Sequence, residues 1–96
     1  MYLILWETNP SLYPLDPGER MKLTMSQMEM TKKDIDSGNV KMWGISAGGG
    51  NGFAITDDDP KTSFEKSMMY TPYVKFEIRP MLSMDEAANV VKGMQK

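Results

Sequence analysis

The sequence contains no cysteine and no histidine. Without cysteine the chain has no disulfide, no thiol nucleophile and no Cys-ligated zinc or iron–sulfur site, which fits the reducing, cytoplasmic location that we expect. Without histidine it has no His-based catalytic triad and no His-ligated metal site. We therefore predict neither a metal nor another cofactor. Any acid–base step would depend on a carboxylate, lysine or tyrosine with a shifted pKa.

The sequence also lacks the features of nucleic-acid-binding and membrane proteins. Its net charge is -2 and no Lys/Arg cluster is interleaved with aromatic residues, so we expect no nucleic-acid partner. The apolar opening MYLILW is far shorter than a membrane span and lacks the basic segment and cleavage site of a signal peptide, so we expect no membrane partner. The 96 residues, of which 41% are hydrophobic and 25% charged, predict one globular domain over residues 1–96.

The first third of the chain predicts a strand and a long helix. The apolar run Tyr2–Thr8 precedes an Asn-Pro pair, as expected for a buried strand that ends in a loop. In LDPGER, Asp16 can cap a helix that has Pro17 at its first position and Glu19 three residues after the cap. Gly38 can end this helix in the left-handed conformation.

The predicted helix is rich in methionine. We expect its buried face to be a stripe at helical spacing, with two threonines filling in: Met21, Met25, Met28 and Ile35, with Thr24 and Thr31. Because thioethers are soft ligands, the spacing of Met25, Met28 and Met30 could also suit Cu(I). Methionine fills irregular gaps in cores well, and we favour the core interpretation.

Two strand-like runs, residues 40–46 and 52–56, flank the glycine-rich stretch SAGGGNG. A phosphate-binding glycine loop needs a helix N-terminus after it, and a Lys-Ser or Lys-Thr pair usually follows. Here the next predicted element is a strand. The stretch therefore predicts a β-hairpin with an Asn-Gly turn rather than a phosphate site.

A second helix is predicted after Asp59, which can act as its cap with Pro60 at the first position. We expect its inner face to include Phe64 and Met68. The acidic residues 57–59 could bind a cation such as Ca²⁺, but they lack the spaced oxygen ligands of an EF-hand loop. Helix capping and a solvated turn explain them better.

The stretch YVKFEIRPM alternates as a strand does, which separates its side chains onto two faces. One face holds Val74, Phe76 and Ile78; the other holds Tyr73, Lys75, Glu77 and Arg79. After Pro80, Ser83 with Glu86 forms the pattern of a capping box. The short helix that it begins is expected to bury some of Ala87, Ala88, Val91 and Met94.

The order βαββαβ plus a C-terminal helix predicts an α+β, ferredoxin-like fold, with a four-stranded antiparallel sheet and both main helices on one face. By strand parity, the other face must carry an apolar set, either Tyr2, Ile4 and Trp6 or else Leu3 and Leu5. The sheet of a second copy would cover this face. We therefore predict a homodimeric α/β barrel that encloses a cavity.

The segments DPGERMK, SGN and PYVKFEIRPM in this order resemble the muconolactone isomerase-like branch of the dimeric α/β-barrel superfamily. The resemblance covers nearly the whole chain in the order of its elements. It implies a ferredoxin-like protomer, a dimer or higher assembly, and a cofactor-free proton shift on a small lactone carboxylate.

A cofactor-free isomerisation needs a base, a cation for the substrate carboxylate and apolar walls. We assign Glu77 as the candidate base. The other candidate substrate-binding residues are three cations and three aromatic residues: Lys75, Arg79 and Arg20, with Trp6, Trp43 and Tyr73. Alternatively, Lys75, Glu77 and Arg79 form a solvated or mutually paired row that protects an edge strand from aggregation.

Two functions follow from these residues. The first is a cofactor-independent isomerase or lyase that acts on a small carboxylated metabolite in the barrel cavity. The second is a non-catalytic barrel that binds a small ligand or serves as an assembly module.

Overall fold

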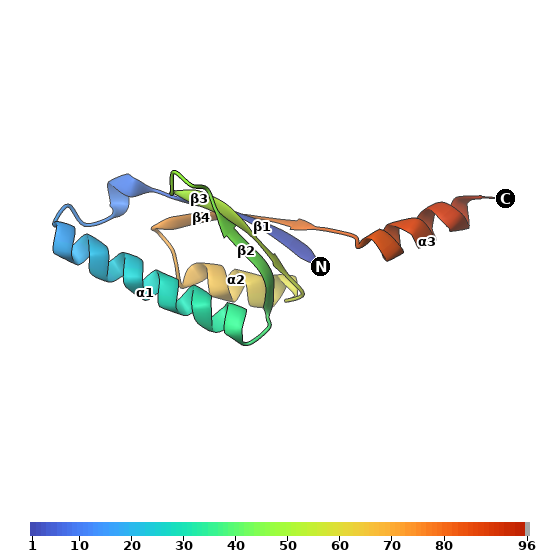
Figure 1. Cartoon of the computed structure of the whole chain (residues 1–96), viewed down its shortest axis with the longest axis horizontal. Coiled ribbons are helices and arrows are strands. Elements are labelled where there is room, and N and C mark those ends of the chain that lie inside the picture. Colours follow the sequence, from blue (N-terminus) through green and yellow to red (C-terminus); the bar gives the residue numbers. More distant parts are fainter. Residues whose placement is uncertain (96) are drawn as a thin grey trace.

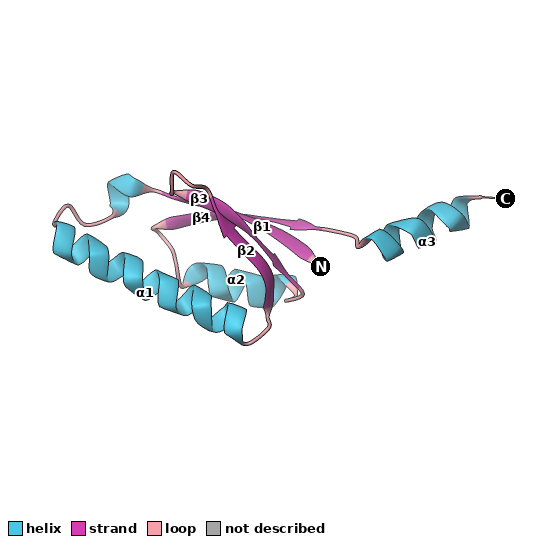
Figure 2. Cartoon of the chain, viewed as in Figure 1, coloured by secondary structure: helices cyan, strands magenta, loops and turns pink. Residues whose placement is uncertain are grey.

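The computed structural model describes residues 1–95 as an α+β fold with a four-stranded antiparallel sheet, compatible with the predicted ferredoxin-like arrangement (Figures 1 and 2). The strands lie in the order β2-β3-β1-β4, and helices α1 and α2 lie on one face of the sheet. The predicted order of elements is confirmed, with one added 3-10 turn, η1. The elements are β1 (Tyr2–Thr8), η1 (Pro10–Leu12), α1 (Pro17–Asp36), β2 (Val40–Ile45), β3 (Asn51–Thr56), α2 (Pro60–Met68), β4 (Val74–Pro80) and α3 (Met84–Met94).

The predicted helix caps are confirmed. The Asp16 carboxylate accepts a hydrogen bond from the Glu19 amide at 2.9 Å, and the Asp59 carboxylate accepts one from the Thr62 amide at 2.8 Å. The bond from Thr62 lowers the pKa of Asp59, because it stabilises the charged form. Each cap satisfies an amide that the first turn of a helix cannot pair internally, so these local signals determine where the helices begin.

The predicted hairpin between β2 and β3 is confirmed, but the prediction of an Asn-Gly turn is wrong. Gly49 and Gly50 take the positive φ values of the turn, 78° and 85°, and the Gly49 amide donates to the Ser46 carbonyl at 2.7 Å. Asn51 already pairs in β3, where its carbonyl accepts from the Ser46 amide at 2.9 Å. Glycine accommodates positive φ at lower cost than asparagine, so the turn forms on the consecutive glycines.

The strand register separates the sheet into two faces. Ile4 lies opposite Ala54 and Ile78, and Trp6 lies opposite Phe76, all on the face that the helices cover. Leu3 and Leu5 lie on the other face, which we call the open face, so the second of the two predicted parities is the observed one. The prediction that Val74, Phe76 and Ile78 share one face of their strand is confirmed, and this face meets the helices.

The predicted buried stripe of α1 is wrong for its apolar members, whereas Thr24 and Thr31 are half-buried. Met21, Met25, Met28 and Ile35 are between 40% and 61% exposed. The half-buried side of the helix is mixed, with four polar residues and two apolar ones: Thr24, Gln27, Thr31 and Asp34, with Leu23 and Met30. Phe64 and Met68, predicted on the inner face of α2, are also exposed, and Ser63 occupies that face. Met25, Met28 and Ile35 line a groove between the helices and the sheet and do not fill it.

The C-terminal helix does not pack on the domain as predicted. Figure 1 shows α3 beyond the end of the sheet, which gives the molecule its extent of 63 × 24 × 23 Å. Val91 and Met94 are exposed, and Ala87 and Ala88 are only half-buried. No helix within residues 1–95 is long and apolar enough to cross a membrane.

Gly52 provides a test of the sheet packing. A Cβ atom at Gly52 would meet the Gly44 carbonyl oxygen and the Trp6 indole, whereas one at Gly48 would meet nothing. We expect Gly52→Ala to lower the free energy of unfolding by about 1–3 kcal/mol through overpacking. Gly48→Ala is the matched control and should change it by less than about 0.5 kcal/mol. Urea unfolding followed by tryptophan fluorescence measures both, and equal effects would contradict the described register.

Candidate functional site

The sheet divides the predicted site residues into two groups. Lys75, Glu77 and Arg79 lie on the open face. Trp6 and Trp43 lie on the opposite face, where they line a groove between the sheet and the helices, and Arg20 borders the same groove from α1. The structure therefore does not bring the predicted base together with the predicted aromatic walls within one chain.

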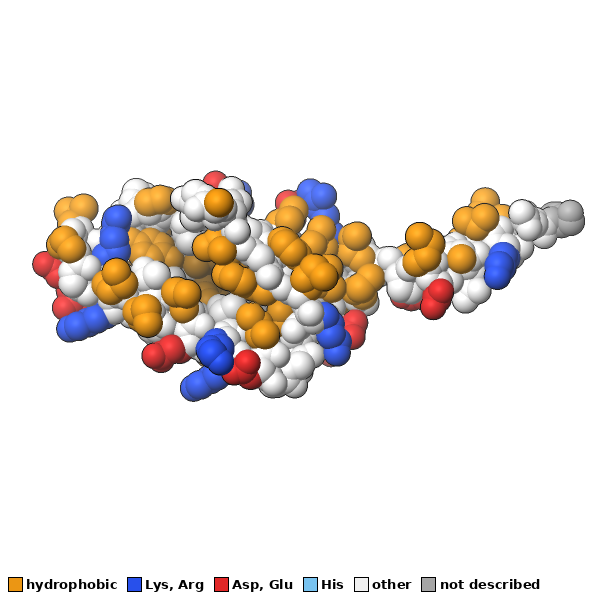
Figure 3. All heavy atoms as spheres, in the orientation of Figure 1, with side chains coloured by type: hydrophobic (Ala, Val, Ile, Leu, Met, Phe, Trp, Pro, Cys, Tyr) orange, Lys and Arg blue, Asp and Glu red, His pale blue; other side chains and the backbone are white. Residues whose placement is uncertain are grey.

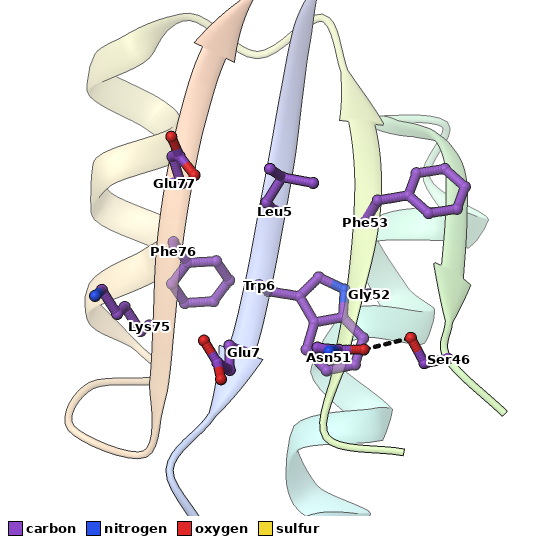
Figure 4. A pocket seen from close by; sticks show the side chains of 10 residues that line it. All are labelled: Leu5, Trp6, Glu7, Ser46, Asn51, Gly52, Phe53, Lys75, Phe76 and Glu77. Atoms are coloured by element: carbon purple, nitrogen blue, oxygen red, sulfur yellow. Dashed lines mark hydrogen bonds between the residues drawn. The ribbon is translucent and has the colours of Figure 1, made fainter. Parts of the chain in front are cut away.

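The open face carries a shallow depression of about 530 Å³, shown in Figure 4. Glu77 and Lys75 stand on the strand at one side of it, Leu5 and Glu7 on the central strand. The Glu77 carboxylate accepts hydrogen bonds from Arg79 Nε at 3.0 Å and Nη2 at 2.8 Å. Their side chains are 58% and 55% exposed, so this arrangement agrees with the alternative of a paired, solvated row on an edge strand.

The second site is a groove of about 810 Å³ between the sheet and helices α1 and α2. Figure 3 shows it as a hollow lined by hydrophobic side chains. The indoles of Trp6 and Trp43 stack on the sheet side, with ring centroids 5.7 Å apart and an interplanar angle of 12°. Met25 and Met28 border the groove from α1, and Phe76 contributes from β4. Its size and its combination of aromatic walls with polar side chains are compatible with a small-molecule site.

One half of the groove is built around Arg20. Its Nε and Nη2 donate to the carbonyls of Pro14 and Pro10 at 3.1 and 3.2 Å, which fixes the 10–14 loop against the first turn of α1. Within this loop, the Tyr13 hydroxyl donates to Gln27 Oε1 at 2.6 Å. Burial raises the pKa of Tyr13, with a smaller contribution from Tyr73, so the hydroxyl keeps its proton. Tyr73 packs edge-on against Tyr13, at a centroid distance of 5.4 Å, and is not part of the Glu77 row.

Three buried polar atoms at the groove have no hydrogen-bond partner within residues 1–95: Trp6 Nε1, Gln27 Nε2 and Ser63 Oγ. Ser63 is only 4% exposed. Leaving a buried donor unpaired costs about 1–3 kcal/mol, so each of these groups favours occupation of the groove by a molecule with hydrogen-bonding atoms.

The other half of the groove contains an ion-paired cluster. Lys66 Nζ lies 2.7 Å from Asp58 and 3.2 Å from Asp34, and this second contact joins α2 to α1. Burial of the ammonium group lowers the pKa of Lys66, but hydrogen bonds with the two carboxylates outweigh burial and the net pKa is raised. A hydrogen bond of 3.0 Å between Thr31 and the Tyr70 hydroxyl forms a further link to α1.

The sequence analysis missed Tyr13, Gln27, Asp34, Lys66 and Ser63. A signal for part of this set was present, because Thr24, Gln27, Thr31 and Asp34 follow helical spacing and make one polar stripe. The methionines on the neighbouring side of the helix are apolar, so the sequence pattern predicts that side as the buried one.

The acidic residues 57–59 do not form a cation site. Asp57 lies 3.7 Å from Lys41, Asp58 pairs with Lys66, and Asp59 caps α2. In residues 1–95 no group of three or more carboxylates is arranged to hold a metal ion.

A family model described as a domain of unknown function, DUF3303, matches residues 1–95, and the chain belongs to this family. No curated protein matches the chain. The family match gives no specific support to the muconolactone isomerase-like branch. Its description names no activity, so function has to be argued from the groove and the open face.

Lys66 provides a test of the helix layer. Lys66→Met leaves Asp34 and Asp58 without their shared cation, and we expect the free energy of unfolding at pH 7 to fall by about 2 kcal/mol. Because the folded state raises the pKa of Lys66 above its ordinary 10.5, the stabilisation is present below pH 10.5. It disappears as the pH rises through the folded value, so the difference between wild type and variant should shrink there.

Lys32→Met is the matched control, because Lys32 pairs with Asp36 at 2.9 Å on the exposed side of α1. An exposed pair of this kind contributes less than about 0.5 kcal/mol. Chemical unfolding of both variants between pH 7 and alkaline pH checks the prediction. A similar loss in both would show that the Lys66 cluster does not join the helices.

Proposed function

We propose that this member of the DUF3303 family is a binding module for a small carboxylated molecule with a flat, apolar body, which it holds in the groove between its helices and sheet. The observation that carries the proposal is a single groove in which stacked indoles adjoin unpaired buried donors and an arginine. Most small-molecule sites combine these elements, namely an apolar wall for affinity and a few polar groups for orientation.

The apolar body would lie against the Trp6–Trp43 pair. Flat rings stack favourably on indoles, and the methionines on the facing helix can adapt to the shape of the ligand. Met25 and Met28 are flexible and only half-covered, so a ligand would shield them from water. Burial of apolar area contributes about 25 cal/mol per Å², which supports binding of a ring system even without a charged contact.

The carboxylate would lie in the Arg20 half. Gln27 Oε1 is occupied by the Tyr13 hydroxyl, which leaves the Gln27 amide nitrogen as a donor. Trp6 Nε1 is a second unpaired donor, and Arg20 retains guanidinium protons beyond the two that bind Pro10 and Pro14. The acidic groups of the groove come from the later turns of α1 (Glu29 and Asp34) and from Asp58, which precedes the cap of α2. Lys66 pairs with both aspartates there. This distribution favours an anion at the Arg20 end.

A second candidate function is a cofactor-free isomerase or lyase of the muconolactone isomerase-like type, in a cytoplasmic homodimer. The observation that favours it is the grouping of Glu77 and Lys75 over one depression, with Arg79 paired to Glu77. In this proposal a second copy would cover the open face and exclude water, and Glu77 would have to exchange its pair with Arg79 for the substrate to act as the base. We favour the binding module because the groove needs no second copy to bring its polar and apolar groups together.

The two proposals predict opposite effects of Gln27→Glu and Glu77→Gln. The probes are benzoate, cinnamate and 2-naphthoate, each compared with its neutral amide. Gln27→Glu retains the oxygen that Tyr13 needs but places negative charge where a carboxylate should bind. We expect it to weaken carboxylate binding by about tenfold or more, since loss of a charged hydrogen bond costs about 1.5–3 kcal/mol. Isothermal titration calorimetry measures the affinities.

Glu77→Gln is the matched control for the groove, because Glu77 lies on the other side of the sheet. It should leave the affinities unchanged, and a carboxylate at 100 times its dissociation constant should stabilise either protein by about 2.7 kcal/mol in thermal unfolding. Binding that is insensitive to Gln27→Glu but lost in Glu77→Gln would support the open-face enzyme instead. No binding of any carboxylate, or equal binding of the amides, would overturn the proposed binding module.

A further inference from the structure

We infer that α3 of one copy docks on the open side of the groove of a second copy, between α1 and β2. The starting observation is the isolation of α3 in its own chain. Among the described residues, no Cα atom of α3 comes within 8 Å of a Cα atom in another helix or strand. Figure 1 shows the helix as an arm that continues beyond the end of β4.

The side chains of α3 are those of a packed helix. Five apolar residues follow the spacing i, i+3, i+4, i+7 and i+10 and form one stripe: Met84, Ala87, Ala88, Val91 and Met94. Met84 is 82% exposed, and Met94 and Val91 are also exposed. Asn89 lies on the opposite side of the helix. A helix of 11 residues is only marginally stable alone in water, so the stripe needs a surface to cover it.

The groove of the domain offers a complementary surface. Its open side is bordered by exposed apolar residues of α1, namely Met25, Met28 and Ile35, and by Ile45 of β2. Amphipathic helices bind in grooves of this kind through apolar residues at i, i+3, i+4 and i+7, and methionine-rich borders adapt to them well. The two alanines in the middle of the α3 stripe allow close approach between helices.

Topology favours a second copy over the chain's own helix. α3 follows β4, which forms one edge of the sheet, whereas the open side of the groove adjoins β2 at the other edge. Three strand spacings separate these edges, about 14 Å. Pro80 and Met84 are four residues apart and can be separated by at most about 14 Å, so the link would have to cross the whole sheet fully extended before α3 began. In addition, α2 packs against β4 on the helix-bearing face. An arm from a second copy meets neither obstacle, and reciprocal docking in a two-fold dimer would cover both stripes and both grooves.

Covering the groove with a partner's helix goes beyond the proposed ligand binding. In this arrangement α3 of the partner contacts Met25, Met28 and Ile35 at the border of the groove. The stacked indoles, which lie deeper in the groove, remain available to a small molecule. Residues of α3 from the other copy, including Val91 and Met94, would then close the groove of each copy.

The absence of cysteine allows a direct test in the full chain. One chain carries Val91→Cys and a second, size-tagged chain carries Met28→Cys. The two are mixed without ligand and treated with a short bismaleimide, and the products are separated by denaturing electrophoresis. We expect a mixed adduct of tagged and untagged chains. Phe53→Cys on the open face replaces Met28→Cys as the positional control and should give no mixed adduct.

The adduct should depend on the apolar stripe. Ala88→Asp, added to the Val91→Cys chain, buries a charge in the contact and should abolish the adduct, with the dimer dissociation constant raised roughly tenfold or more. Asn89→Asp places the same charge on the opposite side of α3 and should leave the adduct intact. Circular dichroism of both variants checks that the domain is folded.

Three results with the mixed chains would overturn the inference: no mixed adduct, an adduct with Phe53→Cys in place of Met28→Cys, or an adduct that survives Ala88→Asp. A further chain carries both Val91→Cys and Met28→Cys, and a crosslink only within single copies of this chain would also overturn the inference. The last result would mean that α3 folds back on its own domain. Because no ligand is present, the outcome is independent of whether the groove binds carboxylates.

Discussion

The structure depends on the way α1 is held over the sheet through polar contacts. At one end, Arg20 ties the helix to the carbonyls of the 10–14 loop; at the other, Asp34 meets Lys66 of α2 at 3.2 Å. Between them the Tyr13–Gln27 and Thr31–Tyr70 hydrogen bonds face inward. Polar contacts are directional and restrict the separation of the groups they join, whereas an apolar stripe could have collapsed onto the sheet. These polar contacts therefore help to hold α1 at a distance from the sheet, and the groove lies between them.

The same arrangement explains the exposed methionines. Since 3.6 residues complete a helical turn, the polar stripe that includes Thr24 and Gln27 places Met21, Met25 and Met28 on a neighbouring side of α1. These side chains are too apolar to be left in water without cost, and they border an open groove. An exposed apolar set of this kind is typical of an interaction site. The isolated stripe of α3 is a second exposed apolar surface on the same chain. The exposed methionines of α1 and this stripe could cover each other, which is the physical reason to consider them together.

Sequence signals identified the elements but not the faces of the helices. The caps at Asp16, Asp59 and Ser83 were predictable because each involves groups within three residues of one another. The alternation of Val74, Phe76 and Ile78 was predictable because it needs only the pleat of one strand. The inward face of α1 was not, because hydrophobicity favoured the methionines and the partners of Gln27 and Asp34 lie 14 and 32 residues away in the chain. Half of the candidate site was missed for this reason, whereas Arg20, Trp6 and Trp43 were found by residue type.

The sheet separates the candidate site residues onto two faces, so the chemistry of each face depends only on the residues that it carries. On the open face, Oε1 of Glu77 already accepts two hydrogen bonds from Arg79 and the side chain is in contact with water, so a proton transfer there requires another surface to cover it. In the groove, the donors of Gln27 and Trp6 are buried and unpaired before any ligand arrives. A buried donor without a partner raises the free energy of the empty state, and this cost is recovered when an acceptor binds. This cost is the physical basis of the proposed ligand binding, and Gln27 and Trp6 would not have to give up an exposed pair to take part in it.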